Sequence, residues 1–257
     1  MTMRLKGKAA LVTGSSSGIG EAIALRFARE GADVAVHYHS EGDEARAVMA
    51  EIETLGRKSV ALGANVGSAA EAEGLVRDAH AALGRLDILV NNAGVEIREP
   101  FVDVSEQHFD LVLGVNLKGA FFAAQAAARL MIAAGDGGRI INVSSIHEDV
   151  AFLNYATYTT SKGGMRMFTR TVCQELAPHG ITVNDIAPGA IATPINKRTL
   201  GDGELLHALQ DVIPVGRLGE PDEVASVAVF LASDEAAYVT GSTYYIDGGM
   251  SRWNKGL

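Results

Sequence analysis

Short apolar runs alternate with longer segments of helical periodicity along the whole chain. The runs are continuously apolar, a pattern typical of strands in a sheet that helices cover on both faces. We predict strands at Ala9–Val12, Asp33–His37, Ser59–Leu62, Ile88–Asn91, Arg139–Val143, Thr182–Ala187 and Tyr244–Ile246.

The segments between these runs have helical patterns. Clear examples are Gly18–Arg29, Asp43–Leu55 and the long stretch Phe109–Ala134. Glycine, a common residue at helix ends, stops the patterns just before the next strand. The glycines in these positions are Gly31, Gly56, Gly84, Gly135 and Gly180.

Alternating strands and helices predict an α/β fold, in which right-handed crossovers connect mostly parallel strands. We therefore expect residues 1–257 to form a single doubly wound Rossmann-type domain with a mostly parallel seven-stranded sheet flanked by helices. The irregular stretch Ile191–Leu218 is the only long interruption, and we interpret residues 191–218 as a substrate lid within that domain.

Composition narrows the class of protein. The chain has 257 residues, a hydrophobic fraction of 47%, a formal net charge of −9 and one cysteine, Cys173. One cysteine cannot form an intrachain disulfide, and no cluster of basic residues indicates nucleic-acid binding. We expect no metal site, no membrane-spanning stretch of about 20 apolar residues and no apolar signal segment at Met1–Lys8. The expected location is the cytoplasm.

A glycine-rich turn follows the first strand. Gly14, Gly18 and Gly20 are separated by three residues and then by one, and a helix comes next. Glycines allow a tight turn and a close approach to a pyrophosphate, while the helix N-terminus offers free N–H groups to the anion. The position between strand and helix predicts a dinucleotide site, although glycine-rich turns often have no ligand.

A second group of residues has the chemistry of proton transfer. Tyr158 and Lys162 are four residues apart, so they share one face of a helix. A nearby ammonium would lower the pKa of a tyrosine, whose usual value is about 10. Ser145 precedes this pair, whereas Tyr155 has no lysine four residues later and Ser144 should point away from the site.

Together these motifs resemble the short-chain dehydrogenase/reductase family. The resemblance rests on the glycine turn, on Asn91-Asn92-Ala93-Gly94 after the fourth strand and on Tyr158-x3-Lys162, and it extends from Lys6 to Gly249. Family membership implies a Rossmann-type fold, NAD(H) or NADP(H) as cofactor, and a homotetramer.

The resemblance also implies a role for each catalytic residue. Ser145 would hold and polarise the substrate oxygen, and Tyr158 would act as the general acid or base. Lys162 would lower the pKa of Tyr158 and bond the nicotinamide ribose. Asn116 would hold a water that connects Lys162 to solvent. A structural role, as a buried amide that satisfies a helix irregularity, is compatible with this one.

Cofactor contacts are expected from several loops. No acidic residue stands at Tyr38 to repel a 2′-phosphate, so we predict that NADP(H) is accepted and that NAD(H) is also usable. The residues predicted to bind the cofactor are Gly14, Ser16, Ser17, Gly18, Ile19, Gly20, Tyr38, His39, Ser40, Asn65, Val66, Asn92, Ala93, Gly94, Tyr158, Lys162, Pro188, Gly189, Ile191 and Thr193.

The substrate is predicted from finer motif details, which look closer to bacterial glucose 1-dehydrogenases. Glu96, His147 and Asn196 would place polar groups beside Ser145 and so favour a sugar. The alternative interpretation is that Glu96 and Glu148 are solvated loop acids. Two other functions stay open: a 3-oxoacyl thioester reductase or other NADPH-dependent carbonyl reductase, and a non-catalytic dinucleotide-binding regulator.

Overall fold

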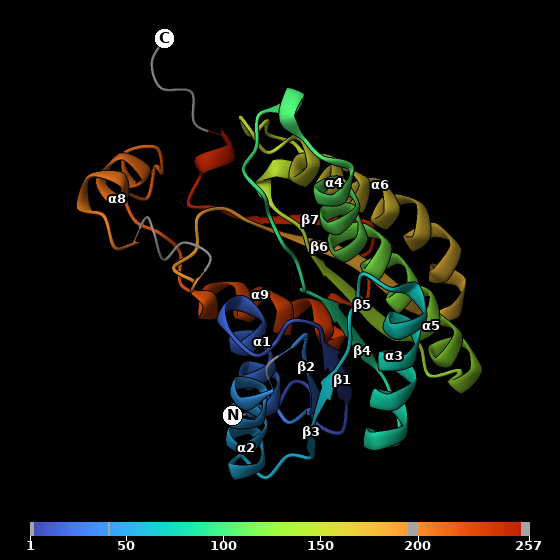
Figure 1. Cartoon of the computed structure of the whole chain (residues 1–257). Helices are drawn as coiled ribbons and strands as arrows, with labels where there is room; N and C mark the ends of the chain where they lie inside the picture. The colour runs from blue at the N-terminus through green and yellow to red at the C-terminus, as the bar shows by residue number, and fades with distance from the viewer. Residues whose placement is uncertain (1–2, 41, 195–199, 253–257) are drawn as a thin grey trace.

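A computed structural model describes residues 3–40, 42–194 and 200–252. Its centre is a sheet of seven parallel strands in the order β3-β2-β1-β4-β5-β6-β7, which is a doubly wound arrangement (Figure 1). The strands are β1 Ala9–Val12, β2 Asp33–Tyr38, β3 Ser59–Gly63, β4 Ile88–Asn91, β5 Gly138–Val143, β6 Ile181–Pro188 and β7 Thr243–Ile246.

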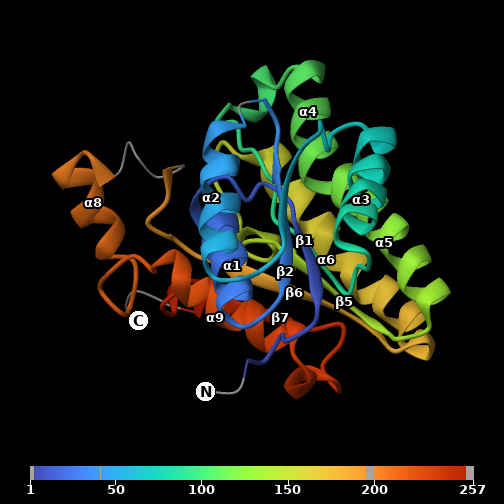
Figure 2. The same ribbon diagram turned by 90° about the horizontal axis from the view of Figure 1, so that it is seen from below.

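Helices cover both faces of this sheet, as Figure 2 shows from below. One layer buries apolar side chains against α1 (Gly18–Arg29), α2 (Asp43–Thr54) and α9 (Pro221–Ala232). The opposite layer is built on α3 (Ala69–Leu83), α5 (Ala120–Ala134) and α6 (Ala156–Leu176). The predicted single Rossmann-type domain with seven parallel strands is confirmed.

Element boundaries agree closely with the sequence pattern. The five glycines predicted to stop helices all have positive φ, from +71° at Gly180 to +98° at Gly31. The predicted long helix Phe109–Ala134 differs, because the structure divides it into α4 (Glu106–Leu113), a π-helical turn (Gly114–Gly119) and α5. The π-helical turn surrounds Asn116, one of the predicted site residues.

We expected no stretch long and apolar enough to cross a membrane, and this expectation is wrong. One helical segment of the described chain meets the criteria of length and composition. The continuous helical segment Glu106–Ala134 is 29 residues long with a mean hydropathy of 1.4. Of its apolar window, 56% is buried inside the domain, where the small side chains of α5 pack against α3 and the sheet. This segment is therefore a core helix of an α/β fold.

The stretch predicted as a lid leaves the sheet after β6. Ile191 is buried and pairs with Gly219 in an isolated parallel bridge, so the two ends of the stretch lie together. Between them is α8 (Gly203–Gln210), which has no buried residue and lies apart from the main body (Figure 1). Residues 195–199, which include the predicted substrate residue Asn196, lie outside the described part of the chain.

Candidate active site

The predicted site residues come together where the parallel strands end. The loops after β1, β2, β3, β4, β5 and β6 all emerge at the carboxyl edge of the sheet. Ligands bind at this edge in open α/β sheets, where the strand order reverses between β1 and β4. The topology therefore brings the glycine turn and the catalytic motif to one place.

The glycine turn is held in a single shape by β4. The Asn92 amide donates to the carbonyls of Thr13 and Gly14, at 2.9 and 2.8 Å. A Cβ on Gly20 would lie 2.2 Å from the Gly14 carbonyl oxygen, and Gly14 itself has φ +60°. The side-chain N–H groups of Asn92 thus hold the turn, and its contact with a cofactor stays a prediction.

The start of α1 has the properties of an anion site. Ser17 is the N-cap, yet its side chain makes no capping hydrogen bond. The first N–H groups of a helix have no partner within that helix, and the helix dipole favours negative charge there. Thr193 lies beside this end, with its methyl carbon 3.5 Å from where a Cβ on Gly18 would be. These residues fit a dinucleotide pyrophosphate.

Other predicted cofactor residues line the same edge. Tyr38 packs over Gly63, whose Cβ would lie 3.0 Å from the tyrosine ring. The Asn65 side chain accepts a hydrogen bond from the Gly67 amide at 3.0 Å, which shapes the turn after β3. Gly189 lies against Asp247, whose carboxylate accepts hydrogen bonds from the Gly249 and Ser251 amides and so shapes the turn after β7.

Ser145 and Tyr158 are in direct contact. Ser145 is the N-cap of the short 3₁₀ helix Ile146–Glu148, where its hydroxyl accepts a hydrogen bond from the His147 amide at 3.2 Å. The same hydroxyl hydrogen-bonds Tyr158, one turn into α6. Ser145 is buried and Tyr158 is half-buried, so the pair can hold a substrate oxygen largely away from water.

Lys162 follows one turn later on α6. Its Nζ lies 5.6 Å from the centre of the Tyr158 ring and donates to the Val143 carbonyl at 2.9 Å. Burial lowers the pKa of Lys162 to about 8, although Asp185, Glu148 and Glu96 oppose that shift. The lysine is thus anchored under the tyrosine.

The net shift of the Tyr158 pKa is upward, although the charge of Lys162 alone would lower it, and the contribution of Lys162 stays a prediction. Burial dominates and raises the pKa of Tyr158 to about 12; the Ser145 hydrogen bond lowers it and the charge of Glu96 raises it. Desolvation of the phenolate, which depends on the folded structure, outweighs the effect of a neighbouring positive charge. Tyr158 therefore carries its proton at neutral pH.

Asn116 is completely buried in the π-helical turn. Its Oδ1 accepts from the Val95 amide at 2.8 Å, and its Nδ2 donates to the Val95 carbonyl at 2.9 Å and to Ser161 at 3.1 Å. Asn116 is thus a buried amide at a helix irregularity, and the compatible role of holding a water next to Lys162 stays a prediction. Hydrogen bonds to both the amide and the carbonyl of Val95 fix the segment that leads to Glu96.

Two of the three predicted substrate residues can be placed. Glu96 is exposed at the rim, yet its carboxylate influences both Tyr158 and Lys162, and partial desolvation raises its pKa. The His147 ring stands edge-on to Tyr158 with centroids 6.4 Å apart, stacks on Phe152 at 4.1 Å, and bonds the Val150 carbonyl through Nδ1. Asn196 lies outside the described residues.

Sequence reasoning missed a group of buried ionisable side chains behind the catalytic lysine. The Glu148 side chain is fully buried, 3.6 Å from Arg166, and accepts from the Tyr245 hydroxyl at 3.3 Å, so the solvated-acid interpretation is wrong for Glu148. Asp185 accepts hydrogen bonds from Asn142 and Thr169, and burial raises its pKa to about 8. A carboxylate inside an apolar strand was the signal available.

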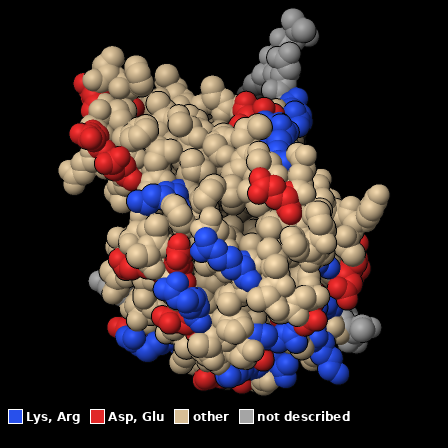
Figure 3. Space-filling view, turned by 90° about the vertical axis from the view of Figure 1, so that its right-hand side faces the viewer, with Lys and Arg blue, Asp and Glu red and all other residues tan. Residues whose placement is uncertain are grey.

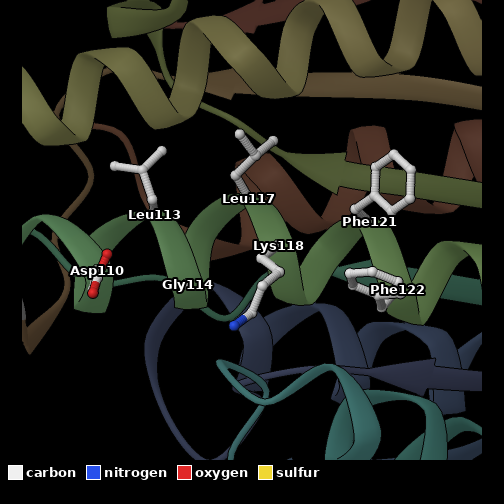
Figure 4. A pocket seen from close by; sticks show the side chains of 7 residues that line it. All are labelled: Asp110, Leu113, Gly114, Leu117, Lys118, Phe121 and Phe122. Atoms are coloured by element: carbon white, nitrogen blue, oxygen red, sulfur yellow. The ribbon is translucent and has the colours of Figure 1, made fainter.

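A hollow of about 570 Å³ lies on the helical surface outside the site. The side chains that line it come from the continuous helical segment Glu106–Ala134. Leu113, Leu117 and Phe121 point toward α6, whereas Lys118 points away from α6 (Figure 4). Figure 3, a view from the side of α3, α5 and α6, shows a broad area with few charged side chains. Phe109, Leu111, Phe121 and Met167 are between 41% and 57% exposed there.

Comparison with known proteins identifies the family. A family model described as "Enoyl-(Acyl carrier protein) reductase" matches residues 14–251, a span that contains the glycine turn, Ser145, Tyr158 and Lys162. The chain belongs to the short-chain dehydrogenase/reductase family. It is thus an oxidoreductase that acts on a hydroxyl or carbonyl group with a nicotinamide dinucleotide.

Individual relatives cover nearly the whole chain. A 3beta-hydroxysteroid dehydrogenase 1 of Eggerthella lenta is 42% identical over 96% of this chain and 95% of its own length. An L-rhamnose 1-dehydrogenase (NAD(P)(+)) of Azotobacter vinelandii is 43% identical over 96% and 98%. A gluconate 5-dehydrogenase structure from Burkholderia cenocepacia, in complex with NADP and tartrate, has 34% identity and a TM-score of 0.92, covering 98% of each chain.

Proposed function

We propose that this short-chain dehydrogenase/reductase oxidises a cyclic aldose at its anomeric carbon to the lactone. The observation that carries the proposal is the pair of polar side chains, Glu96 and His147, beside the Ser145–Tyr158 hydrogen bond. The relative named L-rhamnose 1-dehydrogenase supports an aldose as substrate. Glucose is one such aldose, and rhamnose is another.

In this proposal each residue has one task. Ser145 donates to the anomeric oxygen, the phenolate form of Tyr158 accepts the anomeric hydroxyl proton, and the hydride leaves C1 for the nicotinamide that a bound cofactor would supply. The positive charge of Lys162 assists because a phenolate must form transiently in a buried site. Since Tyr158 holds its proton at neutral pH, oxidation should become faster as the pH rises.

NADP is the proposed cofactor, with NAD also accepted. The end of β2 presents Tyr38, His39 and Ser40, none of which is acidic. Arg46 lies beside this segment, with a guanidinium nitrogen 2.6 Å from where a Cβ on Gly42 would be, although Asp43 pairs with it. A cation here favours a 2′-phosphate, and this basic residue was missed by the sequence argument.

A direct assay tests the aldose. The purified enzyme is incubated with NADP or NAD and a panel that includes glucose, rhamnose and their deoxy analogues, and absorbance of the reduced cofactor is followed. We expect Glu96→Gln and His147→Ala to raise KM for the sugar far more than KM for the cofactor, because a site built for hydroxyls loses its partners. No reduction of cofactor with any aldose would contradict the proposal.

A second candidate function is oxidation or reduction of an apolar ring or acyl chain. The observation in its favour is an apolar rim, in which Phe101, Val102 and Leu153 are between 79% and 86% exposed. The hydrogen bond from the Glu99 amide to the Asn154 carbonyl joins the two loops that carry them. The steroid dehydrogenase relative fits this candidate. If the enzyme turned over a 3-hydroxysteroid or an acetoacetyl thioester and no aldose, this second function would replace the proposed aldose oxidation.

The remaining parts of the proposal concern assembly and location. We propose a homotetramer in which the apolar face of α4, α5 and α6 contacts a second copy, and a lid at residues 191–218 that contains the weakly packed α8. We propose a cytoplasmic location, which the buried free thiol of Cys173 supports.

A further inference from the structure

His37 is buried beneath the glycine turn and takes no part in the proton transfer or in the substrate contacts described above. It is 2% exposed and lies on β2, the strand next to β1. The Gly14 amide donates to its Nδ1 at 2.8 Å, and its Nε2 lies 3.0 Å from the Ala64 carbonyl oxygen after β3. An amide can only donate and a carbonyl can only accept, so the ring is neutral with its proton on Nε2.

The backbone of His37 joins the same network. Its amide donates to the Ser15 hydroxyl and its carbonyl accepts from the Ser15 amide, both at 3.0 Å. Two consecutive amides of the glycine turn, at Gly14 and Ser15, are thus directed at β2. The open N–H groups at the start of α1 are left to face the pyrophosphate.

We propose that the neutral His37 imidazole is a positioning residue that sets the shape of the dinucleotide-binding turn, and that protonating it weakens cofactor binding. In a protonated ring Nδ1 carries a proton and can no longer accept a hydrogen bond. The buried Gly14 N–H would then lose its partner and face the Nδ1–H group instead. The turn would then have to move away from β2. Binding should therefore fail in acid.

The surroundings of His37 favour the neutral ring. Burial lowers its pKa, the Ala64 carbonyl opposes that shift, and the nearby His39 imidazole adds to it. The segments in contact with the His37 ring, residues 13–18 and 64–65, have no ionisable side chain. Two ionisable residues lie farther along the same network: Tyr38 follows His37 on β2, and the Glu71 carboxylate accepts a hydrogen bond from the Asn65 amide. Cofactor binding should be lost only as the pH falls below the usual histidine value of about 6.5.

The test is NAD binding by calorimetry between about pH 5 and 8. NAD is the probe because it lacks the 2′-phosphate, a group that titrates near pH 6. For the wild type we expect Kd to rise by up to about tenfold per pH unit below the His37 pKa. His37→Asn, whose carbonyl can replace Nδ1 as acceptor, should bind with little pH dependence. His37→Leu should bind about tenfold more weakly at every pH.

Two controls make the outcomes distinct. His179→Asn removes an exposed histidine and should keep the wild-type profile. The nitrogen shifts of His37 in labelled wild-type protein should show the Nε2–H form at pH 8 and its protonation in the acid range where Kd rises. Parallel profiles for the wild type and His37→Asn, or wild-type affinity in His37→Leu, would overturn the proposal. Absence of dinucleotide binding by the wild type at every pH would instead overturn the proposed function.

Discussion

Asp185 gives the sharpest prediction about stability. Replacement by asparagine should stabilise the protein, and the gain should grow with pH. The side chain is fully buried, and one of its carboxylate oxygens has no hydrogen-bond partner among the described residues. Asparagine keeps an acceptor for the Asn142 amide, 3.1 Å away, and for the Thr169 hydroxyl, while it removes the ionisation.

The magnitude follows from the pKa of Asp185, which burial raises from 3.8 to about 8. A carboxyl group with a raised folded-state pKa contributes stability below its unfolded-state pKa and loses it as the pH rises through the folded-state value. Between the unfolded-state and folded-state pKa values, the free energy of unfolding of the wild type falls by about 1.4 kcal/mol per pH unit. The stability advantage of Asp185→Asn should therefore grow by about 3 kcal/mol between pH 5 and pH 7.

Urea unfolding at fixed protein concentration measures this difference. Asp149→Asn is the control, because its carboxylate is paired with Arg166 and has a lowered pKa; it is ionised in both states above pH 5, so the effect of that variant should stay constant between pH 5 and pH 7. An advantage for Asp185→Asn that stays constant with pH, or a loss of stability at pH 7, would refute the reasoning.

Two further predictions concern packing. Gly20→Ala should lose about 1–3 kcal/mol of stability and weaken NAD(P) binding, because its Cβ would overlap the Gly14 carbonyl oxygen. Urea unfolding measures the stability and calorimetry the binding, and no change in either would contradict the tight turn. Phe121→Glu, at the exposed apolar face, should convert the proposed tetramer into smaller species in sedimentation experiments, whereas Glu175→Gln on the exposed surface should not; an unchanged assembly would exclude that face.

The fold was predictable because each of its elements leaves a local signal. Apolar runs marked the strands, and glycines with positive φ marked helix ends such as Gly31 and Gly180. The catalytic pair Tyr158 and Lys162 was predictable because four-residue spacing on a helix fixes a shared face. The π-helical turn was not, since it depends on the bonds between Asn116 and Val95 across the fold.

Electrostatic effects were the least predictable part of the site. The pKa of Tyr158 depends on burial, and burial depends on the loops after β4 and β5. The same holds for Glu148, which looks like a loop acid in sequence and becomes a buried partner of Arg166. His37 appears in sequence as one polar residue at the end of an apolar strand, and its contact with Gly14 exists only after β1 and β2 pair.

The central claim is that Tyr158 transfers the proton while the glycine turn binds the cofactor. The most direct measurement compares Tyr158→Phe with the wild type in turnover and in NADP affinity on the same preparation. We expect turnover to be abolished and Kd for NADP to stay near the wild-type value, because phenylalanine removes only the hydroxyl that Ser145 contacts. Substantial turnover by Tyr158→Phe would contradict the account, and Tyr155, which stacks on Phe152 at the start of α6, would then be the residue to test.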